Sequence, residues 1–291
     1  MDGIVIINKE KGYTSNDVVR VVKKLLGKKV GHTGTLDPNA TGVLPLLLGD
    51  ATKVSKYLIN HDKEYEVVLQ LGEKTTTADC EGEVLETKSI DEVIWNKEYI
   101  QNVLKSFIGK QEQVPPIYSA IKVNGKKLYE YARKGQEVEI KARQIEIYNI
   151  SLIDMNKQEK QITFTVKCSK GTYIRTLCED IAEKLNTVGY TKELNRISVG
   201  EFNIENSLTV KELESSIEKN DFSMIIKIED LLNFPKIDLK KKDLDKYLNG
   251  VKITINSDNG PYKIYLENKF IGIGTVENRK LKRDLVTIGN F

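Results

Sequence analysis

Gly31-His-Thr-Gly-Thr-Leu-Asp-Pro-Asn-Ala-Thr-Gly-Val-Leu-Pro45 is the least ordinary stretch of the chain. It places one carboxylate, Asp37, between small residues and a proline, in a loop whose glycines let another molecule approach the main chain. A Walker loop is excluded because valine follows Gly42, and a dinucleotide loop is excluded because a helix precedes the segment. By itself the stretch predicts either a site around Asp37 or a simple turn, which Asp and Asn favour.

The elements around this loop follow no regular order. A strand at Ile4–Ile7 precedes a helix from Ser15 to Leu26, which Thr14 or Ser15 can cap and Gly27 ends. Such an order favours an α+β fold over a doubly wound sheet. The other expected elements are an apolar element after residue 42, helices near 51–59, 174–185 and 209–217, and half-buried antiparallel strands at 65–71 and 162–168.

Two later segments have a different composition. Asn124-Gly125, flanked by apolar residues, is typical of a hairpin turn. After Phe234-Pro235, a lysine run at 240–242 leads into short predicted strands near 251–255, 262–267, 270–276 and 284–288, with turns at 259–260 and 267–268. We therefore expect two domains, 1–235 and 236–291, the second a small all-β unit near the lower size limit for independent folding.

The composition is that of a globular protein. The chain has 291 residues and 33.0 kDa, is 40% hydrophobic and 30% charged, and has a mean hydropathy of -0.38. Its longest apolar stretch, Val43–Leu48, is broken by Pro45, and the run Ile4–Ile7 is too short for a signal peptide. We expect no membrane span and a cytoplasmic location.

Cysteine and histidine are too few and too scattered for a metal or disulfide framework. Cys80, Cys168 and Cys178 form no C-x-x-C pair, and His32 and His61 supply at most half of a metal shell. The sequence predicts no metal, no disulfide and no thiol nucleophile.

The small net charge of +3 conceals segregation along the chain. Counted from the sequence, residues 1–60 carry +4, 61–119 carry −6, 120–145 carry +4, 146–235 carry −4 and 236–291 carry +5. Basic residues gathered in blocks are typical of proteins that bind a nucleic-acid backbone, because neutralising the phosphates releases their counterions and so favours binding. Taken alone, each block is more often a solvated lysine-rich face.

The stretch around Asp37 closely resembles the catalytic motif of the bacterial tRNA pseudouridine-55 synthase (TruB) family. The resemblance continues in the family's order from residue 3 to about residue 202. Glu10 departs from it, standing where the family usually has proline, and Asn195 replaces a common basic residue. The other matching motifs are Asn8-Lys-Glu-Lys-Gly-Tyr-Thr-Ser15, Asp62-Lys-Glu-Tyr65, Gln113-Val-Pro-Pro-Ile-Tyr-Ser-Ala-Ile-Lys-Val-Asn-Gly125, Cys168-Ser-Lys-Gly-Thr-Tyr-Ile-Arg175 and Glu193-Leu-Asn-Arg196.

The resemblance implies a reaction that detaches uracil from its ribose, rotates it and rejoins it through C5 without a cofactor. It makes Asp37 the catalytic carboxylate, leaving open whether Asp37 attacks the sugar, attacks the base or removes a sugar proton. Burial raises a carboxyl pKa, so Arg175 is expected to oppose that shift by gripping Asp37 through two parallel hydrogen bonds. The implied substrate-binding residues are Tyr65, also a candidate proton acceptor, Tyr173 and Leu194 around the uracil, His32 in the space that the flipped base vacates, and Lys9 near the first loop.

The resemblance also implies the architecture and the partner. The fold would be α+β, a catalytic domain on a mixed, mainly antiparallel sheet, with an RNA-gripping insertion near residues 112–140 and a small C-terminal β-barrel of the PUA type. The partner would be the T-stem-loop of tRNA, modified at position 55 by a monomer without guide RNA. The competing interpretations are a tRNA-binding or RNA-folding module without required catalysis and a subunit directed by guide RNAs, which the bacterial-type motifs and short C-terminus disfavour.

Overall fold

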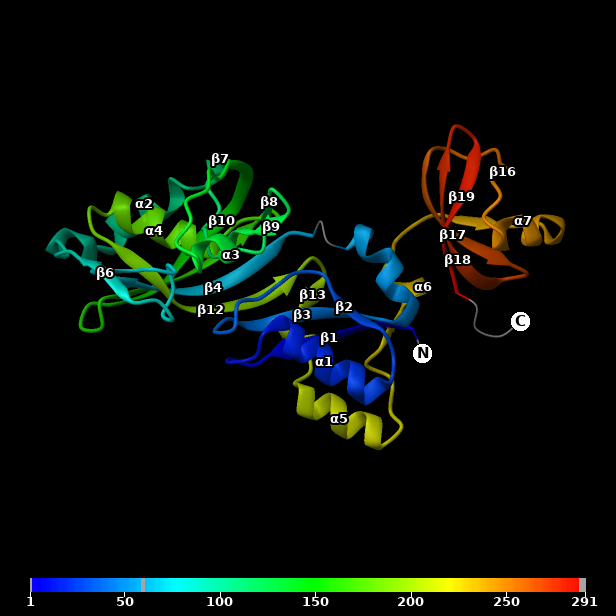
Figure 1. The fold of residues 1–291 in the computed structure, drawn as a ribbon, viewed down its shortest axis with the longest axis horizontal. Coiled ribbons are helices and arrows are strands. Elements are labelled where there is room, and N and C mark those ends of the chain that lie inside the picture. The colour runs from blue at the N-terminus through cyan, green and yellow to red at the C-terminus, as the bar shows by residue number, and fades with distance from the viewer. Residues whose placement is uncertain (1, 59–60, 288–291) are drawn as a thin grey trace.

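A computed structural model describes residues 2–58 and 61–287 (Figure 1). Its main feature is a 10-stranded sheet that runs along the molecule, with pairing antiparallel throughout except where β3 meets β12. This confirms the mixed, mainly antiparallel sheet. Its strands, in the order β14-β1-β3-β12-β4-β11-β10-β7 with β2 on β3 and β13 on β12, are β1 (Gly3–Lys9), β2 (Val30–His32), β3 (Thr41–Leu48), β4 (Lys63–Leu71), β7 (Gly109–Gln113), β10 (Arg143–Asn156), β11 (Gln161–Cys168), β12 (Gly189–Val199), β13 (Phe202–Asn203) and β14 (Ile226–Lys227).

Alternation of side chains along the strands builds a core on each face of this sheet. In β1, Val5 and Ile7 belong to the larger core, whereas Ile4 and Ile6 belong to the core on the other face. The same period is visible in β4 and β11, as predicted from their sequences. Helices cover the larger core in two groups, with α1 (Ser15–Leu26) beside α5 (Val210–Glu218), and α2 (Lys97–Lys105) beside α4 (Ile174–Lys184) (Figure 1).

Local signals explain where the first helix begins and ends. Thr14 caps α1 and forms a capping box with Asp17, and Gly27 ends the helix at φ 63°. The expected helix at 51–59 is instead the 3-10 helix η1 (Gly49–Tyr57), and Ile59 lies outside the described residues. The tighter turn aligns residues three apart, so Ala51 and Val54 share a buried side against β1 and the C-terminal sheet.

A second, five-stranded sheet follows residue 235. Its order is β15-β17-β18-β19-β16, and it contains a short helix, so the prediction of an all-β segment is wrong in that respect. The predicted turn at 267–268 is confirmed. The next turn is at 278–279, so the last strand begins earlier than the expected residue 284. The expected end of that strand, residue 288, lies outside the described residues. The elements are β15 (Lys236–Asp238), η4 (Lys241–Asp243), α7 (Leu244–Leu248), β16 (Ile253–Thr254), β17 (Gly260–Leu266), β18 (Lys269–Glu277) and β19 (Lys280–Val286).

The C-terminal sheet contacts η1 through apolar and polar groups. Ile273 and Leu285 join the core that contains Ile4 and Ile6. At the edge of this contact, Asp284 accepts hydrogen bonds from Lys56 Nζ at 2.7 Å and from Tyr57 Oη at 2.9 Å. The two sheets are therefore held together by side chains and not only by the connecting chain.

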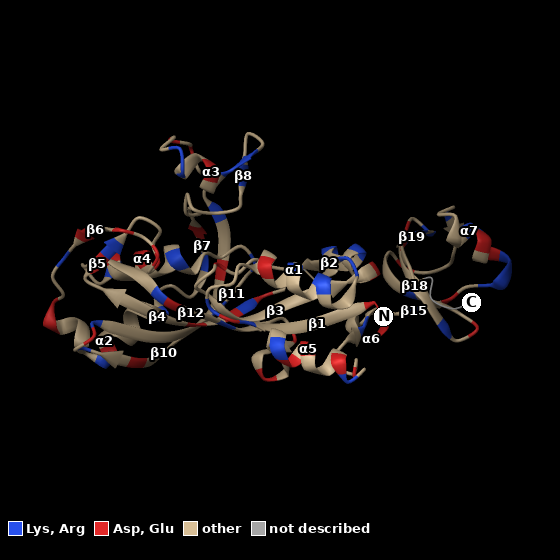
Figure 2. Ribbon diagram, turned by 60° about the horizontal axis from the view of Figure 1, so that its bottom comes forward, with Lys and Arg blue, Asp and Glu red and all other residues tan. Residues whose placement is uncertain are grey.

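A hairpin with a short helix projects from the main sheet between β7 and β10 (Figure 2). The hairpin pairs β8 (Lys122–Val123) with β9 (Lys126–Lys127), and α3 (Leu128–Ala132) follows. Asn124 and Gly125 both have positive φ, as a tight turn of this kind requires, which confirms the predicted hairpin.

The remaining elements are β5 (Glu73–Thr75), β6 (Val84–Thr87), η2 (Glu92–Trp95), η3 (Ile204–Asn206) and α6 (Ile228–Leu231). No helix in the described part of the chain is long and apolar enough to cross a membrane.

Candidate active site

A cavity of about 680 Å³ opens between the loop that follows β2, the strands β4, β10 and β12, and the start of α4. This volume suits a nucleotide, because small-molecule sites usually measure several hundred Å³. Five of the predicted site residues line it: Asp37, Tyr65, Tyr173, Arg175 and Leu194. The structure thus brings together residues from four separate sequence motifs.

The loop that carries Asp37, residues 33–40, is held by buried polar side chains, one of which is Ser15. Ser15 Oγ donates to Leu36 O at 3.1 Å and accepts from Leu36 N at 2.8 Å. Ala40 N donates to Asp37 O at 3.1 Å, so Asp37 also begins a turn. The turn and the candidate site, which the sequence left as alternatives, coexist.

Lys9 supports the same loop and does not line the cavity. Its side chain is fully buried, and its Nζ donates to the carbonyl oxygens of Glu10, Tyr13 and Pro38 at 3.0, 2.7 and 3.0 Å. Burial lowers the pKa of Lys9 to about 8. With three carbonyl partners, Lys9 ties the loop after β1, residues 10–14, to the loop that carries Asp37.

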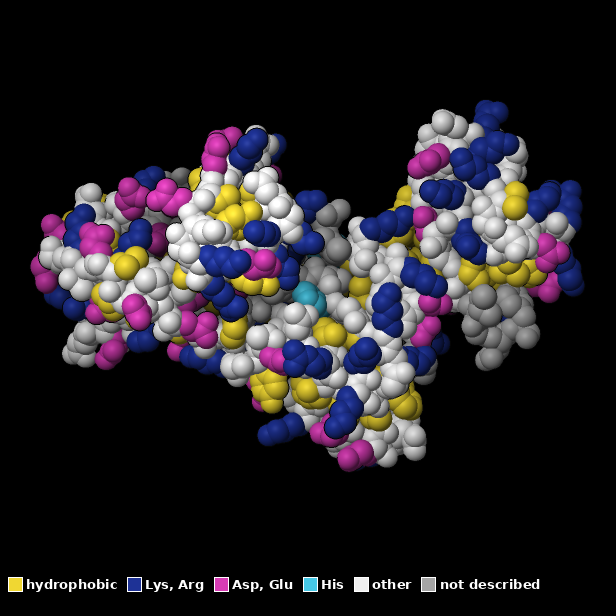
Figure 3. Space-filling view, viewed as in Figure 1, with side chains coloured by type: hydrophobic (Ala, Val, Ile, Leu, Met, Phe, Trp, Pro, Cys, Tyr) yellow, Lys and Arg dark blue, Asp and Glu magenta, His cyan; other side chains and the backbone are white. Residues whose placement is uncertain are grey.

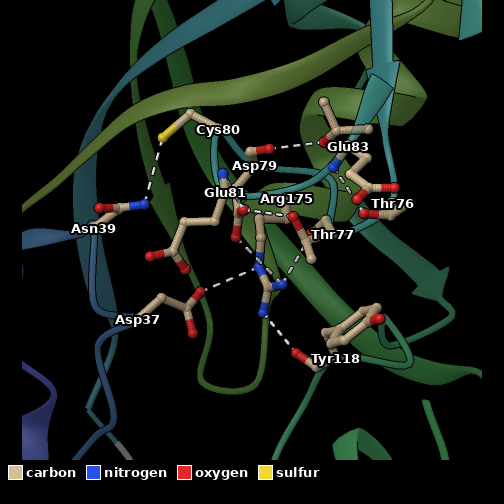
Figure 4. A network of polar contacts seen from close by, with 11 residues as sticks. Asp37, Asn39, Thr76, Thr77, Asp79, Cys80, Glu81, Glu83, Tyr118 and Arg175 are labelled. Carbon is tan, nitrogen blue, oxygen red and sulfur yellow. Dashed lines mark hydrogen bonds and ion pairs between the residues drawn. The ribbon is translucent and has the colours of Figure 1, made fainter. Parts of the chain in front are cut away.

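Arg175 lies between two carboxylates and two carbonyl groups (Figure 4). Its Nε is 3.1 Å from Asp37 Oδ2, and its Nη1 is 3.6 Å from Asp79 Oδ2. Nη1 and Nη2 also donate to Thr77 O at 3.0 Å and to Tyr118 O at 2.8 Å. The ion pair is present, but the expectation of two parallel bonds to Asp37 is wrong, because the other nitrogens of the fork bind Asp79, Thr77 and Tyr118.

The charge balance at Asp37 is set by burial and by three neighbouring groups. Burial raises the pKa of Asp37 above its ordinary value, and Asp79 adds to that shift, while Arg175 and Lys9 oppose it. The Asp37 side chain retains 41% of its surface, whereas that of Arg175 retains 7%. The carboxylate therefore remains open to the cavity while its cationic partner is enclosed.

Tyr65 and Tyr173 both form part of the cavity wall. Tyr65 lies in β4 with 7% exposure, and burial raises its pKa. Tyr173 precedes α4, where Gln113 fixes its main chain by accepting from Tyr173 N at 2.8 Å and donating to Tyr173 O at 3.0 Å. Leu194, which is half-buried in β12, completes the apolar part of the wall.

His32 ends β2, half-buried, and is absent from the cavity lining. Its Nδ1 is buried, and no hydrogen-bond partner for it is found within residues 2–58 and 61–287. Burial lowers the pKa of His32, and the nearby Arg196 lowers it further, so the neutral imidazole is favoured.

The described residues contain no group of three or more His, Cys, Asp and Glu side chains that could hold a metal ion.

Sequence reasoning missed three residues of this site. Asp79 belongs to none of the matching motifs, and its role depends on a contact with α4 that is remote in sequence. Tyr118 and Arg196 lie within those motifs but were assigned no role. Arg196 is 1% exposed and lines the cavity. A buried arginine is visible only once the sheet is assembled.

Basic side chains gather at several places on one face of the molecule (Figure 3). Figure 3 shows Lys and Arg gathered over the C-terminal sheet, over α1 and beside the hairpin β8–β9, whereas acidic side chains mix with them at the end that carries α2. Lys122, Lys126, Arg133 and Lys134 are exposed on the hairpin and after α3. The three basic blocks of the sequence therefore all reach the surface.

Comparisons with known proteins agree with this arrangement. The family model of the TruB family pseudouridylate synthase N-terminal domain matches residues 23–174, and that of the tRNA pseudouridylate synthase B C-terminal domain matches residues 175–251. A protein of Clostridium kluyveri named tRNA pseudouridine synthase B is 45% identical over 97% of this chain and 98% of its own length. A protein with the same name from Caldanaerobacter subterraneus subsp. tengcongensis is 42% identical over 97% of this chain and 98% of its own length.

The fold is also found in a solved structure of a Cbf5-Nop10-Gar1 complex. One chain of that complex matches with a TM-score of 0.69 at 24% identity, over 98% of this chain and 84% of its own length. At this identity the likeness shows the fold alone. From the family models and the two close relatives, the chain belongs to the TruB family of pseudouridylate synthases.

Proposed function

We propose that the protein is an isomerase that converts uridine to pseudouridine at position 55, in the T-loop of tRNA, with Asp37 as its catalytic carboxylate. Relatives named tRNA pseudouridine synthase B, matched over 97% of this chain, support the reaction and the substrate class. The observation that carries the proposal is the ion pair in the cavity wall, where Arg175 Nε lies 3.1 Å from Asp37 Oδ2.

The proposed reaction is an internal rearrangement. The bond between N1 of uracil and C1′ of ribose breaks, a bond between C5 and C1′ forms, and a proton leaves C5 while N1 gains one. Because no atom or electron is gained overall, the step requires neither a cofactor nor an energy source. Asp37 acts in its ionised form, and Arg175 favours that form against the effect of burial.

The cavity would receive the uridine after it leaves the RNA stack. Flipping a nucleotide requires a few kcal/mol, which contacts in the pocket must offset. We assign Tyr65, Tyr173 and Leu194 to the surfaces that hold the uracil during its rotation, since all three line the cavity with Asp37. His32 is assigned to the vacated position in the stack, which suits its place at the end of β2 outside the cavity.

The basic surfaces would bind the tRNA around this uridine. We assign the insertion, near residues 112–140, to gripping the T-loop, and residues 236–291 to a PUA-like RNA-binding domain attached to a catalytic domain of residues 1–235. RNA of this kind is recognised mostly by loop shape and phosphates, which suits mobile lysines and arginines. On this proposal the protein acts as a monomer without guide RNA, in the cytoplasm where tRNA is found.

Pseudouridine mapping on a tRNA transcript tests the proposal. Purified protein is incubated with an unmodified tRNA transcript and no other RNA, and pseudouridine is mapped base by base. We expect one modified base, at position 55, and none in a transcript with cytidine there. Modification elsewhere would contradict the assigned position, and tight binding without any pseudouridine would favour the alternative of an RNA-binding or folding module.

A further inference from the structure

Arg196 is a buried cation in the wall of the cavity that binds the chain on both sides of Asp37. It lies in β12, is 1% exposed, and lines the cavity with Asp37 and Tyr65. Its Nε donates to Val43 O at 2.7 Å, and its Nη2 donates to Gly34 O at 3.0 Å. Since Gly34 precedes Asp37 and Val43 follows it, one guanidinium holds both ends of the loop that carries the carboxylate.

The sheet register places this arginine between the loop and Tyr65. Arg196 is the partner of Gly42 across the parallel pair β12–β3 and of Tyr65 across the antiparallel pair β12–β4. Directly opposed residues project to the same face of a sheet, so the guanidinium and the phenol meet there. Gly42 has φ +102°, and a Cβ at this position would lie 2.2 Å from Arg196 O, which shows how closely the two backbones approach.

The charge of Arg196 has no carboxylate to balance it. Within residues 2–58 and 61–287, Tyr65 is the one titratable group that favours the charged guanidinium, and no acidic side chain lies within ion-pair distance. Arg175, by contrast, faces both Asp37 and Asp79. A buried charge without an opposite charge is unfavourable, and an apolar side chain of similar volume would avoid that penalty. The cation is therefore explained by what it does at the cavity and not by packing.

The charge of Arg196 also acts on the phenol of Tyr65. Burial raises the pKa of Tyr65, whereas Arg196 lowers it by favouring the phenolate. Arg196 thus acts on the phenol oxygen through its charge and on the loop of Asp37 through its two hydrogen bonds.

We propose that Arg196 is a positioning residue of the isomerisation, which fixes the Asp37 loop and the Tyr65 phenol in one arrangement across the uracil pocket. The inference rests on the proposed function. Arg196 acts through Asp37 and Tyr65, and its guanidinium does not touch the reacting atoms.

The test compares Arg196→Lys, Arg196→Gln and Arg196→Met with a matched control, Asn195→Ala. The control removes a hydrogen bond from Thr41 Oγ1, 3.2 Å away at the same end of the loop, but leaves the cavity wall intact. The single-turnover rate of pseudouridine formation at saturating protein is measured beside the Kd for tRNA, at a temperature where circular dichroism shows the variants folded.

We expect each Arg196 variant to lose about 100-fold in the saturating rate, the loss expected for a shift of about 1 Å in a reacting group, with little change in Kd. Lysine, which keeps the charge, should retain the most activity and methionine the least, and Asn195→Ala should stay within about threefold of wild type. If wild type modifies tRNA and the lysine and glutamine variants match it, or if only their Kd changes, the inference is wrong. If none of the three variants folds, Arg196 is structural and the inference is also wrong. An inactive wild type would instead refute the proposed function.

Discussion

Replacing Arg175 by lysine tests how much the guanidinium fork contributes. Arg175 contacts Asp37, Asp79, Thr77 O and Tyr118 O through three nitrogens. Lysine has a single nitrogen, so it retains the charge but cannot span Asp37 and the Tyr118 carbonyl together. We therefore expect the Asp37 carboxylate to lose its fixed position, not only part of its charge balance.

The size of the effect follows from the hydrogen bonds that lysine cannot make. Hydrogen bonds to charged groups contribute about 1.5–3 kcal/mol each, and the substitution leaves two of them unmade. Because the Asp37 side chain is 41% exposed, solvent weakens its share, which leaves about 2–4 kcal/mol in all. At about 1.4 kcal/mol per factor of ten, the rate should fall roughly 30- to 1000-fold.

The assay is single-turnover pseudouridine formation on a tRNA transcript, with Kd measured in parallel. Arg20→Lys is the matched control, since the Arg20 side chain on α1 is 80% exposed and does not line the cavity, and it should behave as wild type. A saturating rate for Arg175→Lys within threefold of wild type would refute the reasoning, because it would show that the fork geometry contributes nothing.

Two further predictions concern RNA binding and the contact between the sheets. Replacing Lys122 and Lys126 by glutamine should weaken tRNA binding and lower the slope of log Kd against log salt by about 1.4, at roughly 0.7 for each phosphate that is no longer neutralised. Asp284→Asn should destabilise the C-terminal sheet by about 1–3 kcal/mol, as followed by thermal unfolding. Burial alone would raise the pKa of Asp284, but hydrogen bonds from Lys56, Thr275 and Tyr57 outweigh it and the pKa lies below the ordinary value, so this stabilisation is present at neutral pH and is lost as pH falls through the folded-state pKa.

Each of these two predictions has an outcome that would contradict it. Lys97→Gln with Lys105→Gln changes the same charge on α2, which contributes no residue to the cavity, and an equal change in slope there would contradict a specific role for the hairpin. For Asp284, a stability difference that is unchanged between neutral and acidic pH would contradict the pKa argument. Wild type should approach the asparagine variant in stability at low pH, because both then lack the charge.

Short-range signals in the sequence were sufficient for several elements. The capping box at Thr14 and the glycine at position 27 fixed both ends of α1, and Asn124-Gly125 fixed the hairpin turn. Strict alternation of side chains predicted β4 and β11. In each case the residues that decide the structure are neighbours in sequence, so no knowledge of the rest of the fold was needed.

Elements whose pattern is interrupted were not predicted. The 14-residue strand β10 carries two register irregularities against β11, between Ile147 and Asn149 and between Leu152 and Asp154. Each irregularity breaks the two-residue period, so apolar side chains stop alternating with polar ones. The contacts of the site could not be predicted from the sequence for a related reason. Asp79 meets Arg175, and Arg196 meets Gly34, only because the fold brings together strands and loops that are distant in the chain. Resemblance supplied the candidates, but only the assembled sheet shows which groups share the cavity.

The most direct test of the account is the single-turnover rate of Asp37→Asn on a tRNA transcript, measured together with its Kd. Asparagine keeps the shape of the side chain but removes the negative charge that Arg175 holds at 3.1 Å. We predict that pseudouridine formation becomes undetectable while tRNA still binds with a Kd close to that of wild type. Turnover at the wild-type rate would contradict the central claim that an ionised Asp37 carries the reaction.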